Sequence, residues 1–457
     1  MEPNPLFFTM AREVIPEPEF SDYKNSLHKD PVTGLKFNSR KPISKLDFEG
    51  AEMVPWNALG KVLDQRPSFT NDPFFHAGIY YVQDPSAMFA EHIAGQLGDL
   101  LPAEPVIGDL CAAPGGKSVG LLNHLNGRGV LFSNEIIPRR FQVLKDNLTK
   151  WGHTNVMLSN HPIDRLLKLP PLFDLLLMDV PCSGEGMFRK SEAAVKAWTP
   201  ELVEMNAKRQ KELMQKALRL VKPGGIVIYC TCTLNRTENE AVITGLSEAF
   251  ELEGIEIKFP EEWNLLENKE KGHQFIRFLP HRVMGEGMTW TCFKMLDNNH
   301  HPAASIKKRP HLSELSSRKG KELVGIFDQK KLATELLLED EKGQIHLMSR
   351  KQQSLWDLVT GCVKCSVLPI GTFNKERFTP HHFLAMSGLY DESSDPLSLD
   401  LSQSRKYLRR QTFPVSVSLS QGYRLAKYLD ATLGWVKVHK DGKKWTNLYP
   451  TAHRIIN

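Results

Sequence analysis

The sequence has no long apolar run and few cysteines. Among its 457 residues, no uninterrupted apolar stretch approaches the roughly 18 to 20 residues of a membrane helix, so no span is predicted. The first 20 residues lack the basic and then apolar regions of a secretory signal, and the cytoplasm is therefore the expected location. Seven cysteines are too sparse for the disulfide framework of a small secreted domain, so free thiols are expected.

The length and the charge distribution suggest several folding units, one of them basic. A chain of 457 residues is too long for one hydrophobic core and indicates two to four units. The net charge is only +5, yet residues 401–457 hold 11 lysines and arginines against 2 acidic residues. Such a segment suits a polyanion such as nucleic acid. A basic face that is merely solvated is an equally good interpretation of charge alone.

Apolar patterns in the first half of the chain predict a parallel α/β sheet. Short β-type runs occupy residues 105–112, 127–135, 155–160, 173–181 and 224–232. Between them, apolar residues recur at helical intervals over residues 115–125, 139–151 and 200–221. This order predicts a Rossmann-like sheet with helices on both faces, and ligands at the carboxyl ends of its strands.

The rest of the chain divides into three further regions. Residues 1–100 have mixed elements and many prolines, which predicts a small α+β domain, and residues 101–297 contain the parallel sheet. We expect residues 298–390 to be a linker and an intermediate region, because residues 297–320 are polar and aperiodic. Residues 391–457 predict a compact, mainly β module.

The first predicted strand leads into a glycine-rich turn, "GDLCAAPGGKS". Gly115 and Gly116 let the backbone approach a ligand, and Glu135 follows Gly115 by 20 residues, where doubly wound domains place an acid on ribose hydroxyls. The turn alone is a weak signal. NAD and S-adenosylmethionine both fit this geometry, so the reacting groups must decide between them.

Thiols follow the fourth and fifth predicted strands, in "MDVPCSGEGMFRK" and "YCTCTLN". If these strands are neighbours, Cys182 lies beside Cys230 or Cys232. A zinc site is disfavoured because the C-x-C has no matching second pair, and a C-x-C disulfide would be strained. Whether the thiols are packing residues or a nucleophile remains open at this point.

Methylation of cytosine at C5 is a reaction that needs such thiols. That carbon is too electron-poor to accept a methyl group until a thiolate adds at C6. A carboxyl group at N3 and N4, such as Asp179, would stabilise the adduct, and a second thiol would assist its release. Lys117 contributes the positive setting that favours a thiolate.

Six motifs together resemble the Nop/Sun RNA cytosine-5 methyltransferases, and among them the bacterial RsmF-like enzymes of small-subunit rRNA. They are "YYVQDPSAM" (80–88), "DLCAAPGGKS" (109–118), "NEIIPRR" (134–140), "DVPCSGEGMFRK" (179–190), "TCTLNRTENE" (231–240) and "PHRVMGEGM" (280–288). The resemblance implies a class I core that uses S-adenosylmethionine, an N-terminal RNA-contacting domain and a PUA-like C-terminal module.

The resemblance also implies roles for individual residues. Cys232 matches the nucleophile, Cys182 the thiol for product release, and Asp179 the aspartate at the target base and near the cofactor, while Cys230 is an accessory or packing thiol. The positions that match cofactor-binding residues are Cys111, Ala112, Ala113, Pro114, Gly115, Gly116, Lys117, Glu135 and Arg140. Lys117 also counts among the catalytic residues. His161 occupies the usual position of an adenine-binding acid, and Asp164 is the other candidate.

The same resemblance suggests RNA contacts and a substrate. Lys36, Asn38 and Lys41 in "GLKFNSRK" are expected to contact phosphates, as are Lys443 and Lys444. The implied partner is 16S rRNA, at a cytosine of the decoding region in the assembled 30S subunit. No metal, membrane contact or obligate protein partner is expected.

Other functions remain possible on sequence alone. The alternatives are an assembly factor that binds rRNA without catalysis and a methyltransferase of the same family that acts on another RNA such as tRNA. An adenine amino-group methyltransferase is disfavoured by the thiols. The lone "CVKC" at 362–365 is expected to be packing thiols, because no second pair accompanies it.

Overall fold

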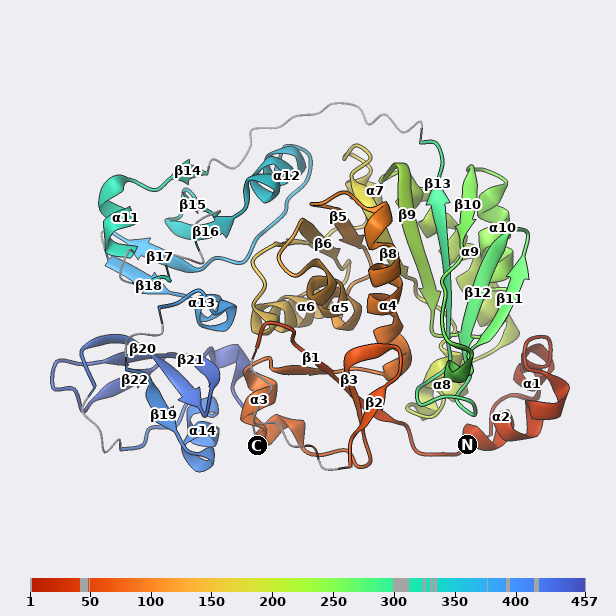
Figure 1. Cartoon of the computed structure of the whole chain (residues 1–457), viewed down its shortest axis with the longest axis horizontal. Coiled ribbons are helices and arrows are strands. Elements are labelled where there is room, and N and C mark those ends of the chain that lie inside the picture. The colour runs from red at the N-terminus through yellow and green to blue at the C-terminus, as the bar shows by residue number, and fades with distance from the viewer. Residues whose placement is uncertain are drawn as a thin grey trace.

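The computed structural model describes residues 2–41, 48, 50–298, 312–323, 326–328, 332, 335–375, 377–391, 395–414 and 419–456. Within these ranges the chain forms four β-sheets with helices packed on and between them (Figure 1). None of the helices described there is long and apolar enough to cross a bilayer.

The N-terminal region has the expected α+β fold. Its antiparallel sheet has the order β2-β3-β1-β4. The strands are β1 (Thr33–Phe37), β2 (Glu52–Val54), β3 (Asn57–Leu63) and β4 (Tyr80–Val82), and the helices are α1 (Pro5–Ala11), α2 (Phe20–Ser26) and α3 (Pro73–His76). Helices α1 and α2 lie apart from this sheet, where Phe7 and Tyr23 pack with Phe188 and Trp198 of the central region (Figure 1).

The central sheet confirms all five predicted parallel strands. They are β5 (Val106–Asp109), β6 (Val130–Asn134), β7 (Val156–Ser159), β8 (Phe173–Asp179) and β9 (Val221–Thr231). Their order is β7-β6-β5-β8-β9, and the apolar runs that predicted them are buried on both faces, as in parallel sheets generally. Four antiparallel strands extend the sheet beyond β9: β10 (Leu252–Ile255), β11 (Leu266–Glu270), β12 (His273–Phe278) and β13 (Met288–Met295).

Helices cover both faces of the central sheet, and each face has its own hydrophobic core. Helices α4 (Phe89–Gln96), α5 (Gly116–Leu125) and α6 (Pro138–Trp151) contribute to one core. The other core includes α7 (Ile163–Leu166), α9 (Pro200–Leu218) and α10 (Glu240–Ser247); the short α8 (Glu192–Ala197) packs near α1. Helix α6 begins with a proline and stops at Gly152, whose φ of 85° suits glycine.

Residues 298–390, which were expected to hold a linker and an intermediate region, form a folded unit in their described part, a sheet that the sequence did not predict. An antiparallel sheet of the order β14-β15-β16-β17-β18 lies there, with three helices. Its elements are β14 (Ser313–Glu314), α11 (Ser317–Leu323), β15 (Leu336–Glu339), β16 (Gln344–Met348), α12 (Arg350–Thr360), β17 (Gly371–Asn374), β18 (Arg377–Pro380) and α13 (His382–Ser387). Strands of two to five residues carry too little periodicity to be seen in the sequence. Residues 299–311 of the proposed linker lie outside the described residues.

The C-terminal module is mainly β, as predicted, and packs against the N-terminal region. Its sheet contains β19 (Leu397–Leu399), β20 (Gly422–Tyr428), β21 (Ala431–Val438) and β22 (Trp445–Asn447), with α14 (Leu401–Leu408) beside it. Leu35 and Tyr80 share a single hydrophobic core with Tyr407 and Leu433. The N-terminal sheet and the C-terminal module therefore form one packed body beside the central sheet (Figure 1).

Candidate active site

Three predicted motifs converge at the carboxyl ends of β5, β8 and β9. Strand β8 pairs with both β5 and β9, so the turns that follow these strands meet at one edge of the sheet. A cavity of about 420 Å³ opens there, and its lining includes Cys111, Glu135, Asp179, Cys182 and Cys232. The sequence-based prediction that these side chains lie together is confirmed.

The thiols of Cys182 and Cys232 are in direct contact. Their Sγ atoms are 2.9 Å apart and both side chains are partly exposed, whereas Cys230 is buried with its Sγ 3.6 Å from Oδ1 of Asp179. The hydrogen bond to Cys232, followed by burial, raises the pKa of Cys182 well above its ordinary value. Cys182 is thus held as a thiol next to a second sulfur.

A lysine and an aspartate form an ion pair beside the thiols. Nζ of Lys117, in the first turn of α5, lies 2.7 Å from Oδ2 of Asp179. Burial alone would lower the pKa of Lys117, but the charge of Asp179 and its hydrogen bond raise it above its ordinary value. Lys117 therefore stays cationic, and it supplies the positive charge that a thiolate needs.

The glycine-rich turn is fixed by side chains of α6. Nη2 of Arg140 donates to the carbonyl oxygen of Ala113 at 2.6 Å, and Nδ2 of Asn147 donates to that of Pro114 at 2.9 Å. Gly115 has a φ of 113°, a conformation that side chains other than glycine rarely adopt. Oε1 of Glu135 accepts from the backbone N–H of Ile137 at 2.9 Å, which fixes the carboxylate in the cavity wall.

Both candidates for the adenine end line the cavity, and each already has a partner. The Asp164 carboxylate pairs with Nζ of Lys216 at 2.7 Å, and Nε2 of His161 lies 2.9 Å from the carbonyl oxygen of Lys364. A role for Asp164 in cofactor binding stays a prediction.

The predicted phosphate contacts of Lys36 and Asn38 are wrong. Lys36 is fully buried, where it pairs with Glu91 and donates to Oδ1 of Asn57 at 2.6 Å. Nδ2 of the buried Asn38 donates to the carbonyl oxygen of Trp151 at 2.8 Å. Both residues lie on or just after β1, inside the protein, and they join it to α4 and α6 instead of to RNA.

Lys41 has a similar structural role, whereas the C-terminal lysines are exposed. Nζ of Lys41 donates to the carbonyl oxygens of Ala77 and Lys150 at 2.7 and 2.5 Å, so it does not present a free cation. Lys443 and Lys444 lie in the exposed turn between β21 and β22, where only their backbone N–H groups bind Asp441. A phosphate contact at this turn stays a prediction.

The "CVKC" thiols have no metal-binding partners in the described ranges. No group of three or more histidine, cysteine or acidic residues there could hold a metal ion. Cys365 is buried, and its Sγ donates to the carbonyl oxygen of Leu158 at 3.3 Å. Cys365 therefore acts as a packing residue between the intermediate sheet and the central one.

The strand order and the cavity at the strand ends define a class I methyltransferase with S-adenosylmethionine as its cofactor. Three family models match the chain: 16S rRNA methyltransferase RsmB/F over residues 100–294, the N-terminal domain of 16S rRNA methyltransferase RsmF over 4–85, and the methyltransferase RsmF PUA domain over 395–455. The chain belongs to the RsmF family of methyltransferases.

Individual relatives agree with this assignment. The chain is 27% identical over 431 residues to Ribosomal RNA small subunit methyltransferase F of Vibrio campbellii, covering 89% of this chain and 87% of the relative. It is 34% identical over 260 residues to the Escherichia coli protein of the same name, a match that spans 53% of each chain, or about half of that relative. A crystal structure of a methyltransferase homologue from Pyrococcus horikoshii is similar over 64% of this chain and 95% of its own, with a TM-score of 0.52 and 25% identity.

Proposed function

We propose that the protein methylates C5 of a cytosine in 16S rRNA, in the decoding region of the small subunit. The observation that carries this proposal is the contact between the Cys182 and Cys232 sulfurs, next to Asp179, in the wall of the cofactor cavity. The names of the curated relatives support the choice of RNA. Exposed cations at Lys443 and Lys444 fit an RNA substrate.

The cavity has the chemistry that S-adenosylmethionine requires. The Glu135 carboxylate suits the ribose hydroxyls, and Ile136 and Ile137 supply an apolar wall for the adenine. Cys111 lines the cavity at the start of the glycine-rich turn, and we assign residues 111–117 to the methionine end from the family resemblance. When bound, this cofactor supplies the methyl group that C5 receives. Arg140 also lines the cavity, where it holds the carbonyl oxygen of Ala113 and lies 3.5 Å from the Glu135 carboxylate.

Cys232 is the nucleophile of the proposed reaction. Its Sγ gives its proton to solvent, and the thiolate bonds to C6 of the cytosine. The C5–C6 π bond opens in this step and its electrons move to C5, which is then able to form the new C–C bond. Asp179 faces the N3 and N4 edge of the base, and Lys117 keeps the local charge positive. The target base must leave its stack before Sγ can reach C6.

Cys182 acts in the release step. After methylation, C5 loses its proton to a base, the C6–S bond breaks, and its electrons return to Sγ of Cys232 as the ring regains its double bond. Cys182 lies in contact with the departing sulfur and assists this elimination. The two thiols therefore have separate tasks, attack and release.

Two variants test this division of labour. Cys232→Ala should abolish methylation and leave no covalent complex, while Cys182→Ala should accumulate a protein–RNA adduct that survives denaturing electrophoresis. Normal turnover of Cys182→Ala without an adduct would contradict the proposal.

Substrate identity requires a separate measurement. Nucleoside mass spectrometry and bisulfite sequencing of 16S rRNA should show the loss of 5-methylcytosine in a deletion strain. Transfer of labelled methyl groups to tRNA alone would redirect the substrate assignment, and no transfer to either free 16S rRNA or 30S subunits would indicate an assembly factor without activity.

A further inference from the structure

Two buried carboxylates join the turn that carries Cys182 to the segment that carries Cys232. We name residues 181–187 the Cys182 turn and residues 232–240 the Cys232 segment. Glu185 belongs to the Cys182 turn, yet its carboxylate accepts the backbone N–H of Leu234 in the other segment at 2.8 Å. Glu238 belongs to the Cys232 segment, yet it accepts the backbone N–H of Ser183 at 2.9 Å. The Cys182 turn and the Cys232 segment thus each supply a carboxylate that binds a backbone N–H of the other.

Asn235 connects the two carboxylates. Its Nδ2 donates to Oε1 of Glu185 at 2.8 Å and to Oε1 of Glu238 at 3.0 Å, while its Oδ1 accepts the backbone N–H of Glu238 at 2.8 Å. All three side chains are at most 4% exposed. A bond between main-chain groups also joins the segments, from the N–H of Gly186 to the carbonyl oxygen of Cys232 at 2.8 Å.

Neutral donors hold these two carboxylates. Within the described ranges, the ion pairs that the structure forms include neither Glu185 nor Glu238; amide and indole N–H groups bind them instead. Burial of a carboxylate is costly, and it is tolerated only when directional hydrogen bonds compensate for lost hydration. Such bonds fix the relative position of the two segments tightly.

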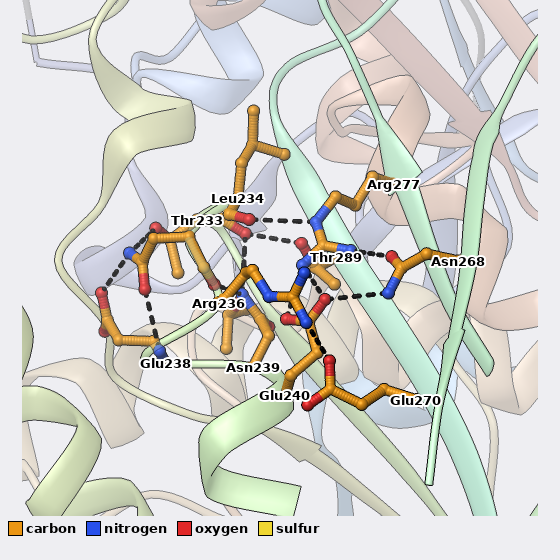
Figure 2. Close-up of polar contacts among 12 residues, drawn as sticks. Thr233, Leu234, Arg236, Glu238, Asn239, Glu240, Asn268, Glu270, Arg277 and Thr289 are labelled. Atoms are coloured by element: carbon orange, nitrogen blue, oxygen red, sulfur yellow. Dashed lines mark hydrogen bonds and ion pairs between the residues drawn. The ribbon is translucent and has the colours of Figure 1, made fainter. Parts of the chain in front are cut away.

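The next acid in the Cys232 segment has a different environment. Oε2 of Glu240 lies 2.6 Å from Nη2 of Arg277, whose Nε donates to the carbonyl oxygen of Leu234 at 2.9 Å. Figure 2 shows Glu238 and Glu240 on opposite sides of the segment, with Glu240 turned toward Arg277 and Asn268. Glu240 therefore secures the segment to β12 and makes no bond to the Cys182 turn among the contacts that the structure forms.

The crossing bonds surround the two sulfurs without touching the cavity. Ser183 and Gly186 lie one and four residues after Cys182, and Leu234 lies two after Cys232. Neither Glu185 nor Glu238 lines the cavity, so neither is placed to contact the cofactor or the base. Any effect of these carboxylates on the reaction must therefore pass through the thiols: both carboxylates act on the positions of the sulfurs, and the charge of Glu238 also raises the pKa of Cys182.

We propose that Glu185 and Glu238 are positioning residues that hold the Cys182 sulfur against the Cys232 sulfur for the release step. This inference rests on the proposed function of the two thiols. Cys232 lies directly after the central strand β9, which places it independently of the two carboxylates, whereas Cys182 lies on a turn that these bonds fix. Loss of a crossing bond should therefore impair release more than attack.

Glu185→Gln and Glu238→Gln test the inference. In Glu185→Gln the amide nitrogen replaces an oxygen that accepts a crossing bond, either from Leu234 or from Asn235. In Glu238→Gln it opposes the N–H of Ser183 or the N–H of Asn235, so either the crossing bond or the connecting bond is lost. We expect the adduct with RNA to form at near the wild-type rate in a single turnover, while multiple turnover falls by roughly 10- to 100-fold. The adduct should accumulate on denaturing gels, as in Cys182→Ala.

Glu240→Gln is the matched control, because it changes a buried carboxylate of the same segment that has no bond to the Cys182 turn. It should lower the unfolding temperature, because it breaks the pair with Arg277, but leave adduct levels as low as in the wild type. An adduct in all three variants would show that general loosening suffices, and would overturn a specific role for Glu185 and Glu238.

The outcomes also separate this inference from the function on which it rests. Suppose that Cys182→Ala accumulates the adduct, but that Glu185→Gln and Glu238→Gln slow adduct formation and adduct release equally. The positioning role is then wrong and the proposed function stands. If Cys182→Ala yields no adduct, the proposed roles of the thiols fail first. Should a glutamine variant not fold, Asn235→Ser removes the connecting amide while both carboxylates remain, and the same expectations and the same contradiction apply to it.

Discussion

At the scale of single residues, three nearby cysteines differ in their surroundings. Cys232 and Cys182 face the cavity, whereas Cys230 is buried two residues before Cys232 along the chain. Alternation along an extended chain puts residues two apart on one face, and Cys230 and Cys232 do both lie on the side of Asp179 and Lys117. Their exposure, which separates a packing thiol from a reactive one, was not readable from that alternation.

Cys230→Ser should keep activity. A hydroxyl can replace the thiol as a donor to Asp179, so we expect a turnover within about threefold of the wild type. The measurement is methyl transfer under saturating RNA, with Cys232→Ala as the inactive reference. A Cys230→Ser variant as inactive as Cys232→Ala would show that the nucleophile has been assigned to the wrong thiol.

Glu238 should make the stability of the protein depend on pH. Burial raises the pKa of this carboxyl from 4.5 to about 7, against opposing hydrogen bonds from Ser183 and Asn235. The pKa of Glu238 is higher in the folded state than in the unfolded state, so its contribution to stability is complete below about pH 4.5 and is lost as the pH rises through about 7. The free energy of unfolding should change by on the order of 3 kcal/mol over this range. Glu185, Cys182 and Tyr229 are the titratable groups that face it.

A glutamine at position 238 cannot titrate, which isolates this effect from the other ionisable groups. The difference in unfolding temperature between the wild type and Glu238→Gln should shift against the wild type as the pH is raised from 5 to 8. Thermal unfolding at several pH values measures it. A difference that is constant with pH would mean that Glu238 titrates at its ordinary pKa.

At the scale of elements, the sequence predicted what long or strongly apolar segments determine. The strands β5 to β9 and the helices α5, α6 and α9 were found because continuous apolar runs and helical periodicity persist over enough residues. The strands β14 to β18 were missed, because each has few residues and is followed closely by a turn. These strands are stabilised by neighbouring elements such as α12, whose Trp356 belongs to a core of the central sheet. The crossing of Glu185 and Glu238 was also missed, because it depends on which turns become neighbours.

Strand β1 illustrates how a family pattern can mislead at this scale. Lys36 looked like a phosphate contact, but its Nζ is paired with Glu91 inside the protein. Lys36→Met should therefore destabilise the fold by roughly 3 kcal/mol, because it leaves a partly buried carboxylate without its partner. Urea unfolding measures the loss, and RNA affinity of the folded fraction should not change. A stable variant with weakened RNA binding would restore the phosphate contact.

At the scale of the whole molecule, the exposed turn between β21 and β22 should contribute to RNA binding from a distance. The double variant Lys443→Ala with Lys444→Ala removes two exposed cations and no core contact. We expect weaker binding at low salt and a slope of log affinity against log salt that is smaller by roughly 1.5. Filter binding over a salt series measures both, and turnover at saturating RNA should stay at the wild-type value. Equal affinities at all salt concentrations would contradict the contact.

The arrangement of the regions was the least predictable feature. Composition divided the chain into an N-terminal region, a central sheet and a basic C-terminal module, but nothing in it showed that the first and the last share one core. Contacts such as that from Nε of Arg405 to the carbonyl oxygen of Asn71, at 3.0 Å, join residues more than 300 positions apart. Pairings of this kind depend on the completed fold and leave no local pattern in the sequence.

The C-terminal module shares one core with the N-terminal sheet, through Tyr407 and Leu433, and a second core with the central sheet, through Leu425 and Trp435. These two cores fix the distance from the basic turn to the reactive sulfurs. An RNA that binds the basic turn must therefore place its target cytosine at a fixed distance from that contact. Distance as well as base identity would then select the target. An RNA helix that is one base pair longer between the two contacts would place a correct cytosine beyond the catalytic pocket.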